Sequence, residues 1–89
     1  MAINKILVVD DSPADLKNIN DILSEAGFFV VTAANGKEAI EKAKAEKPSV
    51  IFMDIIMPTM DGFATCRALS NDEGTKGIPV IFVTSKSQK

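Results

Sequence analysis

Carboxylates follow two apolar segments of this chain. Lys5–Val9 is followed by Asp10 and Asp11, and Val50–Met53 is followed by Asp54. An apolar run of four residues bounded by turn residues is typical of a buried strand in a parallel sheet. Open α/β sheets bind their ligands at the carboxyl ends of such strands. We therefore expect these aspartates to lie together at one edge of a sheet and to form a site there.

The residue types at this edge favour phosphoryl chemistry that depends on a divalent cation. Carboxylates held within a few ångströms repel one another, and a cation relieves that repulsion. Mg²⁺ takes a small number of carboxylates together with waters and a phosphate oxygen. An aspartate that faces such an ion can attack phosphorus as a nucleophile and form an acyl phosphate. The hydroxyl of Thr84, at the end of a later apolar run, could hydrogen-bond a phosphoryl oxygen.

Each of these features also has a purely structural interpretation. Asp10 and Asp11 before Ser-Pro are typical of a turn that leads into a helix. Asp54 alone is commonly a loop residue at a strand end, and Thr84 a strand terminus. Cys66 is best explained as a small core residue rather than a nucleophile. Taken together, these structural interpretations are less convincing, because acidic residues follow both of the strands that would flank the site.

Composition limits the classes of function. A chain of 89 residues forms one small domain, with 46% apolar and 25% charged residues as in ordinary globular proteins. A net charge of -2 with scattered signs gives no basic stripe, so nucleic acid is not an expected partner. One cysteine excludes an internal disulfide, and the absence of histidine excludes imidazole chemistry. With no signal peptide or membrane-spanning stretch, we expect a soluble, cytoplasmic protein without membrane contact.

Strand and helix patterns alternate along the chain. The predicted strands are Lys5–Val9, Phe28–Ala33, Val50–Asp54 and Pro79–Val83, and the predicted helices are Ser12–Ala26, Lys37–Glu46 and Phe63–Ser70. This alternation predicts a parallel sheet with helices on both faces and right-handed crossovers. If the first strand lies between the second and the third, Asp10, Asp11 and Asp54 share the crevice where the strand order reverses.

Local residues mark where the helices begin and end. Ser12 before a proline is a helix cap. Gly27 is predicted to end the first helix in a left-handed conformation. Asn35 and Gly36 are predicted to form a turn, and Pro48 is predicted to stop the second helix at the preceding residue.

Three motifs in this order, LVVDDS, MDIIMPTMDG and PVIFVTS, resemble the receiver domain of two-component response regulators, the CheY-like fold. The resemblance covers the whole chain and is nearest to short single-domain receivers of the chemotaxis and twitching-motility kind. It implies a flavodoxin-like, doubly wound parallel sheet in the order 2-1-3-4. It implies Asp54 as the phosphoacceptor and Thr84 as the switch hydroxyl. It also implies Mg²⁺ bound by Asp11, Asp54 and the backbone carbonyl of Ile56, with Asp10 helping through water.

The implied role is signalling rather than enzymatic. Such a module accepts a phosphoryl group from a histidine kinase or phosphotransfer protein, assists only that transfer, and changes its contacts with a downstream protein. One alternative is an assembly unit whose acidic pocket is only a metal site. A weaker alternative is a haloacid-dehalogenase-like phosphohydrolase. That family has a second acid two residues after its nucleophile, whereas Ile56 follows Asp54 and Ser12 follows Asp10 at that spacing.

The family pattern extends beyond the residues of this chain, so residues 1–89 are expected to be a receiver domain without the usual last helix, strand and helix. The lysine that the family places beside the phosphoryl group and its aromatic switch residue then have no counterpart in residues 1–89, because Lys86 does not stand at the lysine's position. Without that lysine to neutralise phosphoryl charge, we expect slow phosphorylation. Only the helix Ser12–Ala26 would cover one face, leaving it bare over Val50–Met53 and Val80–Val83. Uncovered parallel sheets and open edges favour association. We therefore expect a homodimer or a segment swap through the fourth-strand edge.

Overall fold

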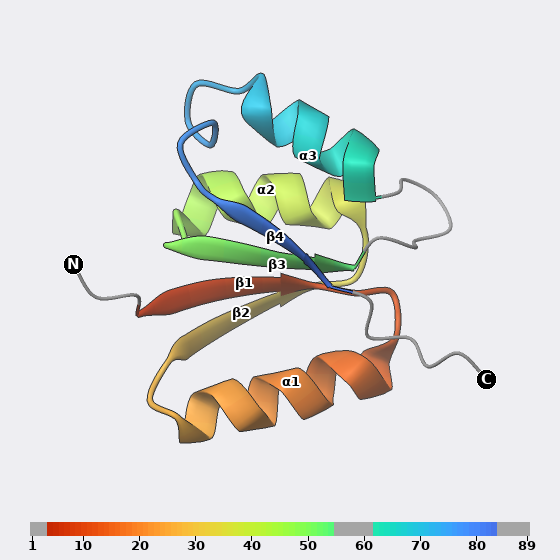
Figure 1. The fold of residues 1–89 in the computed structure, drawn as a ribbon, viewed down its shortest axis with the longest axis vertical. Coiled ribbons are helices and arrows are strands. Elements are labelled where there is room, and N and C mark those ends of the chain that lie inside the picture. Colours follow the sequence, from red (N-terminus) through yellow and green to blue (C-terminus); the bar gives the residue numbers. More distant parts are fainter. Residues whose placement is uncertain (1–3, 55–61, 84–89) are drawn as a thin grey trace.

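Strands and helices alternate along the chain, as the sequence predicts. The computed structural model describes residues 4–54 and 62–83. Within them the elements are β1 (Lys5–Val9), α1 (Pro13–Glu25), β2 (Phe29–Ala33), α2 (Gly36–Glu46), β3 (Val50–Asp54), α3 (Gly62–Ser70) and β4 (Val80–Val83), shown in Figure 1.

The described strands form one parallel, four-stranded sheet in the order β2-β1-β3-β4. The predicted order is therefore confirmed. After β1 the chain adds β2 on one side of β1. It then crosses back through α2 and adds β3 on the other side of β1, so the strand order reverses between β1 and β3. All the strands point the same way, and their carboxyl ends share one edge of the sheet (Figure 1).

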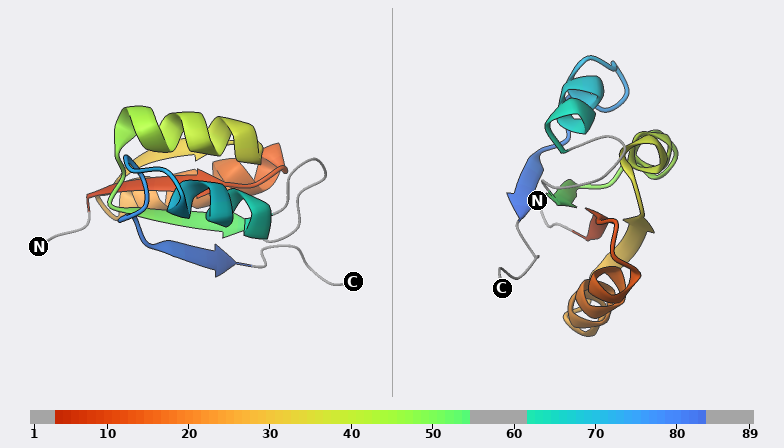
Figure 2. Two further views of the ribbon diagram at one scale, coloured as in Figure 1. Left: turned by 90° about the horizontal axis from the view of Figure 1, so that it is seen from above. Right: turned by 90° about the vertical axis from the view of Figure 1, so that its right-hand side faces the viewer.

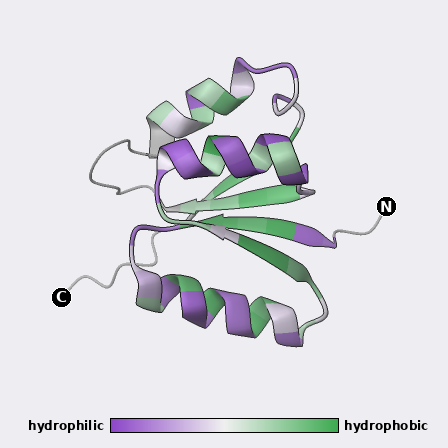
Figure 3. Cartoon of the chain, turned by 180° about the vertical axis from the view of Figure 1, so that it is seen from behind, coloured by the Kyte–Doolittle hydropathy of each residue, from purple (hydrophilic) through white to green (hydrophobic). Residues whose placement is uncertain are grey.

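Helices cover the two faces of the sheet unequally. Figure 2 shows α1 on one face and α2 with α3 on the other. Side chains of β1 alternate between these layers: Ile6 and Val8 belong to the core on the α1 side, and Leu7 and Val9 to the core under α2 and α3. Because both faces of β1 are covered, the strand is apolar without alternation (Figure 3). Burying each such side chain contributes about 1.5–3 kcal/mol.

Helix α1 begins and ends where the sequence predicts. Ser12 is its N-cap, and the Ser12 Oγ accepts a hydrogen bond from the Asp15 N–H at 3.3 Å. Gly27 follows the helix with φ of 99°, a conformation that glycine adopts without penalty. The Phe28 N–H donates to the Leu23 carbonyl at 3.1 Å, a hydrogen bond that belongs to the C-terminal end of α1. Strand β2 begins at Phe29, one residue later than predicted.

The predicted Asn35-Gly36 turn is wrong, because these residues start α2. Asn35 is the N-cap, its Oδ1 accepting from the Glu38 N–H at 2.8 Å, and Gly36 is already helical and buried. Asparagine serves turns and caps equally well, so sequence alone did not separate them. At the other end Lys47 adopts φ 49° and ψ 61°, a left-handed conformation that ends the helix before Pro48.

The segment from α3 to β4 contains a buried polar residue that the sequence did not single out. Thr75 is 1% exposed, and its Oγ1 donates to the Leu69 carbonyl at 2.7 Å, which satisfies one of the last carbonyls of α3. Pro79 lies just outside β4 rather than inside it. Its carbonyl still accepts a hydrogen bond from the Ile51 N–H at 3.0 Å. Proline lacks only the backbone N–H, so its carbonyl can still pair with the neighbouring strand.

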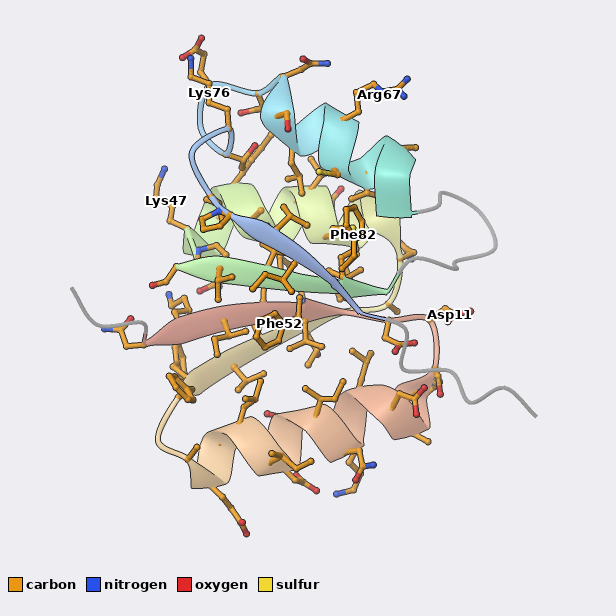
Figure 4. The ribbon with its side chains drawn as sticks, in the orientation of Figure 1. Asp11, Lys47, Phe52, Arg67, Lys76 and Phe82 are labelled. Carbon is orange, nitrogen blue, oxygen red and sulfur yellow. The ribbon has the colours of Figure 1, made fainter. Side chains whose placement is uncertain are left out.

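The α1-side face is less covered over β3 and β4 than over β1 and β2. Val50 is buried at 4% exposure, but Phe52 is half-buried and Ile81 is 48% exposed. Phe52 and Ile81 are neighbours in the β3–β4 register, and we call them the β3–β4 patch. Phe82, one residue along, packs instead with the core on the opposite face, as Figure 4 shows for the two phenylalanines. The bare region predicted from the sequence therefore exists, but it excludes Val50.

Candidate functional site

Asp10 and Asp54 stand beside each other at the edge formed by the strand ends. Val9 of β1 pairs with Met53 of β3, and each aspartate is the next residue of its strand's path. Neighbouring strands are about 4.8 Å apart, so the two backbones are adjacent. A hydrogen bond from the Asp10 N–H to the Ala33 carbonyl at 3.1 Å also holds Asp10 against the end of β2. The predicted convergence of the two strand ends is confirmed at the level of the backbone.

Asp10 is buried, with 1% exposure, and its carboxylate shapes the turn after β1. Its Oδ1 accepts a hydrogen bond from the Ser12 N–H at 3.0 Å. The structural interpretation of Asp10 as a turn residue is therefore correct. It does not compete with a role in binding, because the same bond fixes the direction of the carboxylate.

Asp11 is half-buried and lies beyond the end of β1, at the carboxyl edge of the sheet (Figure 4). Helix α1 begins two residues later at Pro13, so its N-terminus opens close to this edge. The N-terminal end of a helix carries a partial positive charge and favours anions nearby. The edge thus combines acidic side chains with a backbone environment that tolerates negative charge.

Several predicted site residues lie outside what the structure describes. Ile56 and Thr84 fall outside the described residues, and Asp54 is described for its backbone but not for its side chain. Among the side chains that are described, no three acidic, histidine or cysteine groups gather closely enough to hold a metal ion. The structure therefore brings Asp10, Asp11 and the backbone of Asp54 to one edge, and the complete ligand set stays a prediction.

The donors at this edge fit Mg²⁺ by their chemistry. Asp10 and Asp11 supply carboxylate oxygens, the hard ligands that Mg²⁺ prefers, next to the end of a second strand. Asp10 has one oxygen occupied by the Ser12 N–H, which suits a supporting position. Half-buried Asp11 suits direct contact with an ion at the edge.

Ser12 was predicted only as a helix cap, yet it also shapes the site. Its N–H orients Asp10 while its Oγ caps α1. The signal was present in the sequence, because an aspartate side chain often accepts a hydrogen bond from the backbone two residues later. The turn and the helix start are therefore built from the same residue.

No helix in residues 4–54 and 62–83 combines the length and the apolar composition needed to cross a membrane.

Comparison with known proteins decides the family. The model of the response regulator receiver domain matches residues 6–89. This chain belongs to the response regulator receiver family. The receiver is a signalling module of two-component systems, and the resemblance noted in the sequence is confirmed.

Individual receivers support this assignment. The chain is 44% identical to Protein PilH of Pseudomonas aeruginosa over 85 residues, which is 96% of this chain and 70% of PilH. The chemotaxis protein CheY4 of Vibrio cholerae superposes with a TM-score of 0.88 at 36% identity, covering 98% of this chain and 72% of CheY4. The predicted CheY-like fold is confirmed, and the likeness to CheY4 fits the chemotaxis kind of receiver.

A further solved structure bears on the acidic edge. The receiver domain of the sensor histidine kinase PA1611 from Pseudomonas aeruginosa PAO1 has a TM-score of 0.86 at 28% identity, covering 99% of this chain and 72% of its own. That receiver holds a magnesium ion coordinated in its active-site cleft.

Proposed function

We propose that this receiver accepts a phosphoryl group on Asp54 from a histidine kinase or phosphotransfer protein. The signal then passes to a downstream protein through changed contacts. The observation that carries the proposal is the placement of Asp54 beside Asp10, at the point where the strand order reverses. Two acidic strand ends meet there in a family whose modules receive phosphoryl groups.

The transfer is a displacement at phosphorus. A carboxylate oxygen of Asp54 forms the new P–O bond while the bond between phosphorus and the donor's imidazole nitrogen breaks, and the electron pair leaves with the imidazole. Asp11, Asp54 and the backbone carbonyl of Ile56 would hold Mg²⁺, with Asp10 acting through water. When bound, Mg²⁺ neutralises charge on the transferring group. The magnesium in the PA1611 receiver supports this assignment.

Two further residues complete the proposed site. The Ser12 N–H holds the Asp10 carboxylate in a fixed direction. The Thr84 hydroxyl donates a hydrogen bond to a phosphoryl oxygen after transfer and so reports the change to the surface. This is the step by which the module would alter its contacts with the downstream protein.

Acetyl phosphate tests the proposal without a cognate kinase. With Mg²⁺ the parent chain should gain the mass of one phosphoryl group, and Asp54→Asn should gain none. Asp21→Asn is the matched control, since Asp21 is an exposed aspartate on α1. Equal labelling of the Asp54→Asn variant and the control would contradict the proposal.

A second candidate function is assembly with another copy of this chain. It is favoured by the β3–β4 patch, where 48% of Ile81 is exposed beside half-buried Phe52 at the β4 edge of the described sheet. Apolar groups at such an edge favour a homodimer or a segment swap. In sedimentation, Ile81→Lys should weaken self-association while Ile22→Lys, at a 63% exposed position on α1, should not. Equal effects of the two variants would count against this patch as the interface.

A further inference from the structure

The peptide that joins Ala33 to Ala34, at the end of β2, is hydrogen-bonded on both sides. Its carbonyl, on Ala33, accepts a hydrogen bond from the Asp10 N–H at 3.1 Å, and its N–H, on Ala34, donates to the Glu38 Oε1 at 2.8 Å. The N–H and the C=O of a trans peptide lie in one plane and point in opposite directions. A group that fixes the N–H therefore also fixes the carbonyl. Glu38 of α2 thus sets how the Ala33 carbonyl is presented to Asp10.

Lys42 holds the preceding peptide of β2. Its Nζ donates to the Thr32 carbonyl at 2.7 Å, and it also pairs with Glu38, with 3.2 Å between Nζ and Oε2. One ion pair of α2 therefore binds two successive peptides at the end of β2. Helix α2 starts at the carboxyl edge of the sheet, where β1 and β2 end (Figure 1). The pair thus acts on the backbone of the same edge that carries the acidic residues.

Helix capping alone does not account for these contacts. Asn35 is the N-cap of α2, and a glutamate at the position of Glu38 usually binds the N–H of the cap residue itself. Here the Glu38 Oε1 binds the N–H of Ala34, one residue earlier, in the peptide that follows β2. General stabilisation accounts for them no better. Both side chains of the ion pair are 37% exposed, and ion pairs this exposed contribute little to the stability of a fold.

The charge of Glu38 strengthens the hydrogen bond that the same peptide makes to Asp10. A hydrogen bond to a carboxylate is roughly twice as strong as one between neutral groups, and hydrogen bonds in a chain polarise one another. The Ala34 N–H, assisted by Lys42, holds the pKa of Glu38 below its ordinary value, so the carboxylate is charged at neutral pH. The carbonyl of the polarised peptide is thereby a better acceptor for the Asp10 N–H.

We propose that Glu38 and Lys42 are positioning residues for the acidic edge, because through the Ala33–Ala34 peptide they fix the backbone of Asp10. The effect reaches the site because Asp10 is buried and Asp11 is the next residue of the chain. A backbone held at Asp10 therefore fixes the point from which both carboxylates extend. The inference rests on the proposed function for the role of these carboxylates toward Mg²⁺.

The test removes the ion pair without changing the net charge. Glu38→Met/Lys42→Met keeps helix-forming side chains at both positions but loses their polar atoms. Hydrogen exchange of the Asp10 amide, measured without metal, should become about threefold faster or more, because its acceptor is no longer held. The reference is the buried Ile51, whose N–H donates to the Pro79 carbonyl on the far side of β3 and should exchange as in the parent.

Magnesium affinity is the second measurement on the same variant. Groups that orient a metal ligand contribute about 10–100-fold to metal affinity, and this pair acts one residue further from the ion, so titration calorimetry should show binding weakened about threefold. The matched control is Lys17→Met/Asp21→Met. It removes an exposed i,i+4 ion pair, with 3.0 Å between Nζ and Oδ2, from α1. The control should keep both the magnesium affinity and the Asp10 exchange rate of the parent.

A pair of single variants separates the hydrogen bond from the charge. Glu38→Gln and Glu38→Met lose the same charge, but only the glutamine can still accept a hydrogen bond from the Ala34 N–H. Exchange of the Asp10 amide should therefore be slower in Glu38→Gln than in Glu38→Met. If the double variant does not fold, this comparison decides, and equal Asp10 exchange in the two single variants would overturn the proposal.

Other results would also overturn it. Asp10 exchange that rises only in step with Ile51 exchange would show a general loss of stability. Faster Asp10 exchange with unchanged magnesium affinity would show that the pair holds the backbone without serving the site. A parent chain that binds no magnesium would contradict the proposed metal site, whereas the exchange measurements, made without metal, would still decide whether the pair positions Asp10.

Discussion

Asp10 and Asp54 occupy adjacent positions across two neighbouring parallel strands, each one residue beyond the Val9–Met53 pair. The chain leaves these strands in opposite directions, to β2 on one side and to β4 on the other. Open α/β sheets bind ligands at the point where the strand order reverses in this way, which supports the proposed location of the site. The adjacency of Asp10 and Asp54 thus explains why the site is acidic and why it lies between β1 and β3.

Magnesium affinity should depend more on Asp11 than on Asp10. Asp11→Ala removes a half-buried carboxylate that would contact the ion, and should weaken binding about tenfold or more. Asp10→Ala should weaken binding less, but should lower the free energy of unfolding by about 1 kcal/mol because the Ser12 N–H loses its acceptor. Calorimetric titration and urea unfolding measure the two effects. Equal magnesium affinity of Asp11→Ala and the parent would refute the assignment.

Stability in acid should depend on Glu38. The Ala34 N–H, assisted by Lys42, holds the pKa of Glu38 below its ordinary value of 4.5. A carboxyl group with a lowered pKa in the folded state stabilises the fold above its unfolded pKa, and that contribution is lost as the pH falls through the folded pKa. The parent should therefore lose more free energy of unfolding than Glu38→Gln between about pH 6 and about pH 3.

Urea titrations at both pH values provide the measurement. Glu41→Gln, at an exposed position of the same helix, is the control and should follow the parent. A parent and a Glu38→Gln variant with parallel pH profiles would show that the Ala34 contact does not contribute.

Replacing Lys47 with glycine should increase the stability of the fold. Its φ of 49° lies in the left-handed region, which costs a side-chain-bearing residue about 1 kcal/mol and costs glycine almost nothing. Lys47→Gly should raise the free energy of unfolding by about 0.5 kcal/mol, after the greater freedom of glycine in the unfolded chain is counted. Ala45→Gly, inside α2, should instead lower it by about 1 kcal/mol. Thermal unfolding in which both variants lose stability would contradict the assignment of strain to Lys47.

The sequence predicted the order of the elements because each carries a local signal. The apolar run of β1 and the Ser12-Pro13 helix start need no distant partner to be recognised, and both appear where they were expected. The strand order came from the resemblance to the receiver family, and it is this order that places the acidic ends of β1 and β3 side by side. The second strand was predicted one residue too early at Phe28, whose N–H donates to the Leu23 carbonyl and so belongs to the end of α1.

Contacts between elements could not be predicted from the sequence. Lys42 and Glu38 follow an ordinary i,i+4 helical pattern, and nothing in their spacing says that they bond the edge of β2. Thr75 looked like a loop residue, yet it is buried under the end of α3. Such contacts depend on how α2 and α3 are placed against the sheet, which is set by packing rather than by local pattern.

Chemical trapping of the acyl phosphate tests the central claim most directly. Sodium borohydride reduces an aspartyl phosphate to homoserine, which peptide mapping places at a single residue. After treatment with acetyl phosphate and Mg²⁺, the parent chain should carry homoserine at position 54, and a sample without phosphodonor should carry none. Homoserine at Asp10 or Asp11, or its absence from position 54, would contradict the assignment of Asp54 as the phosphoacceptor.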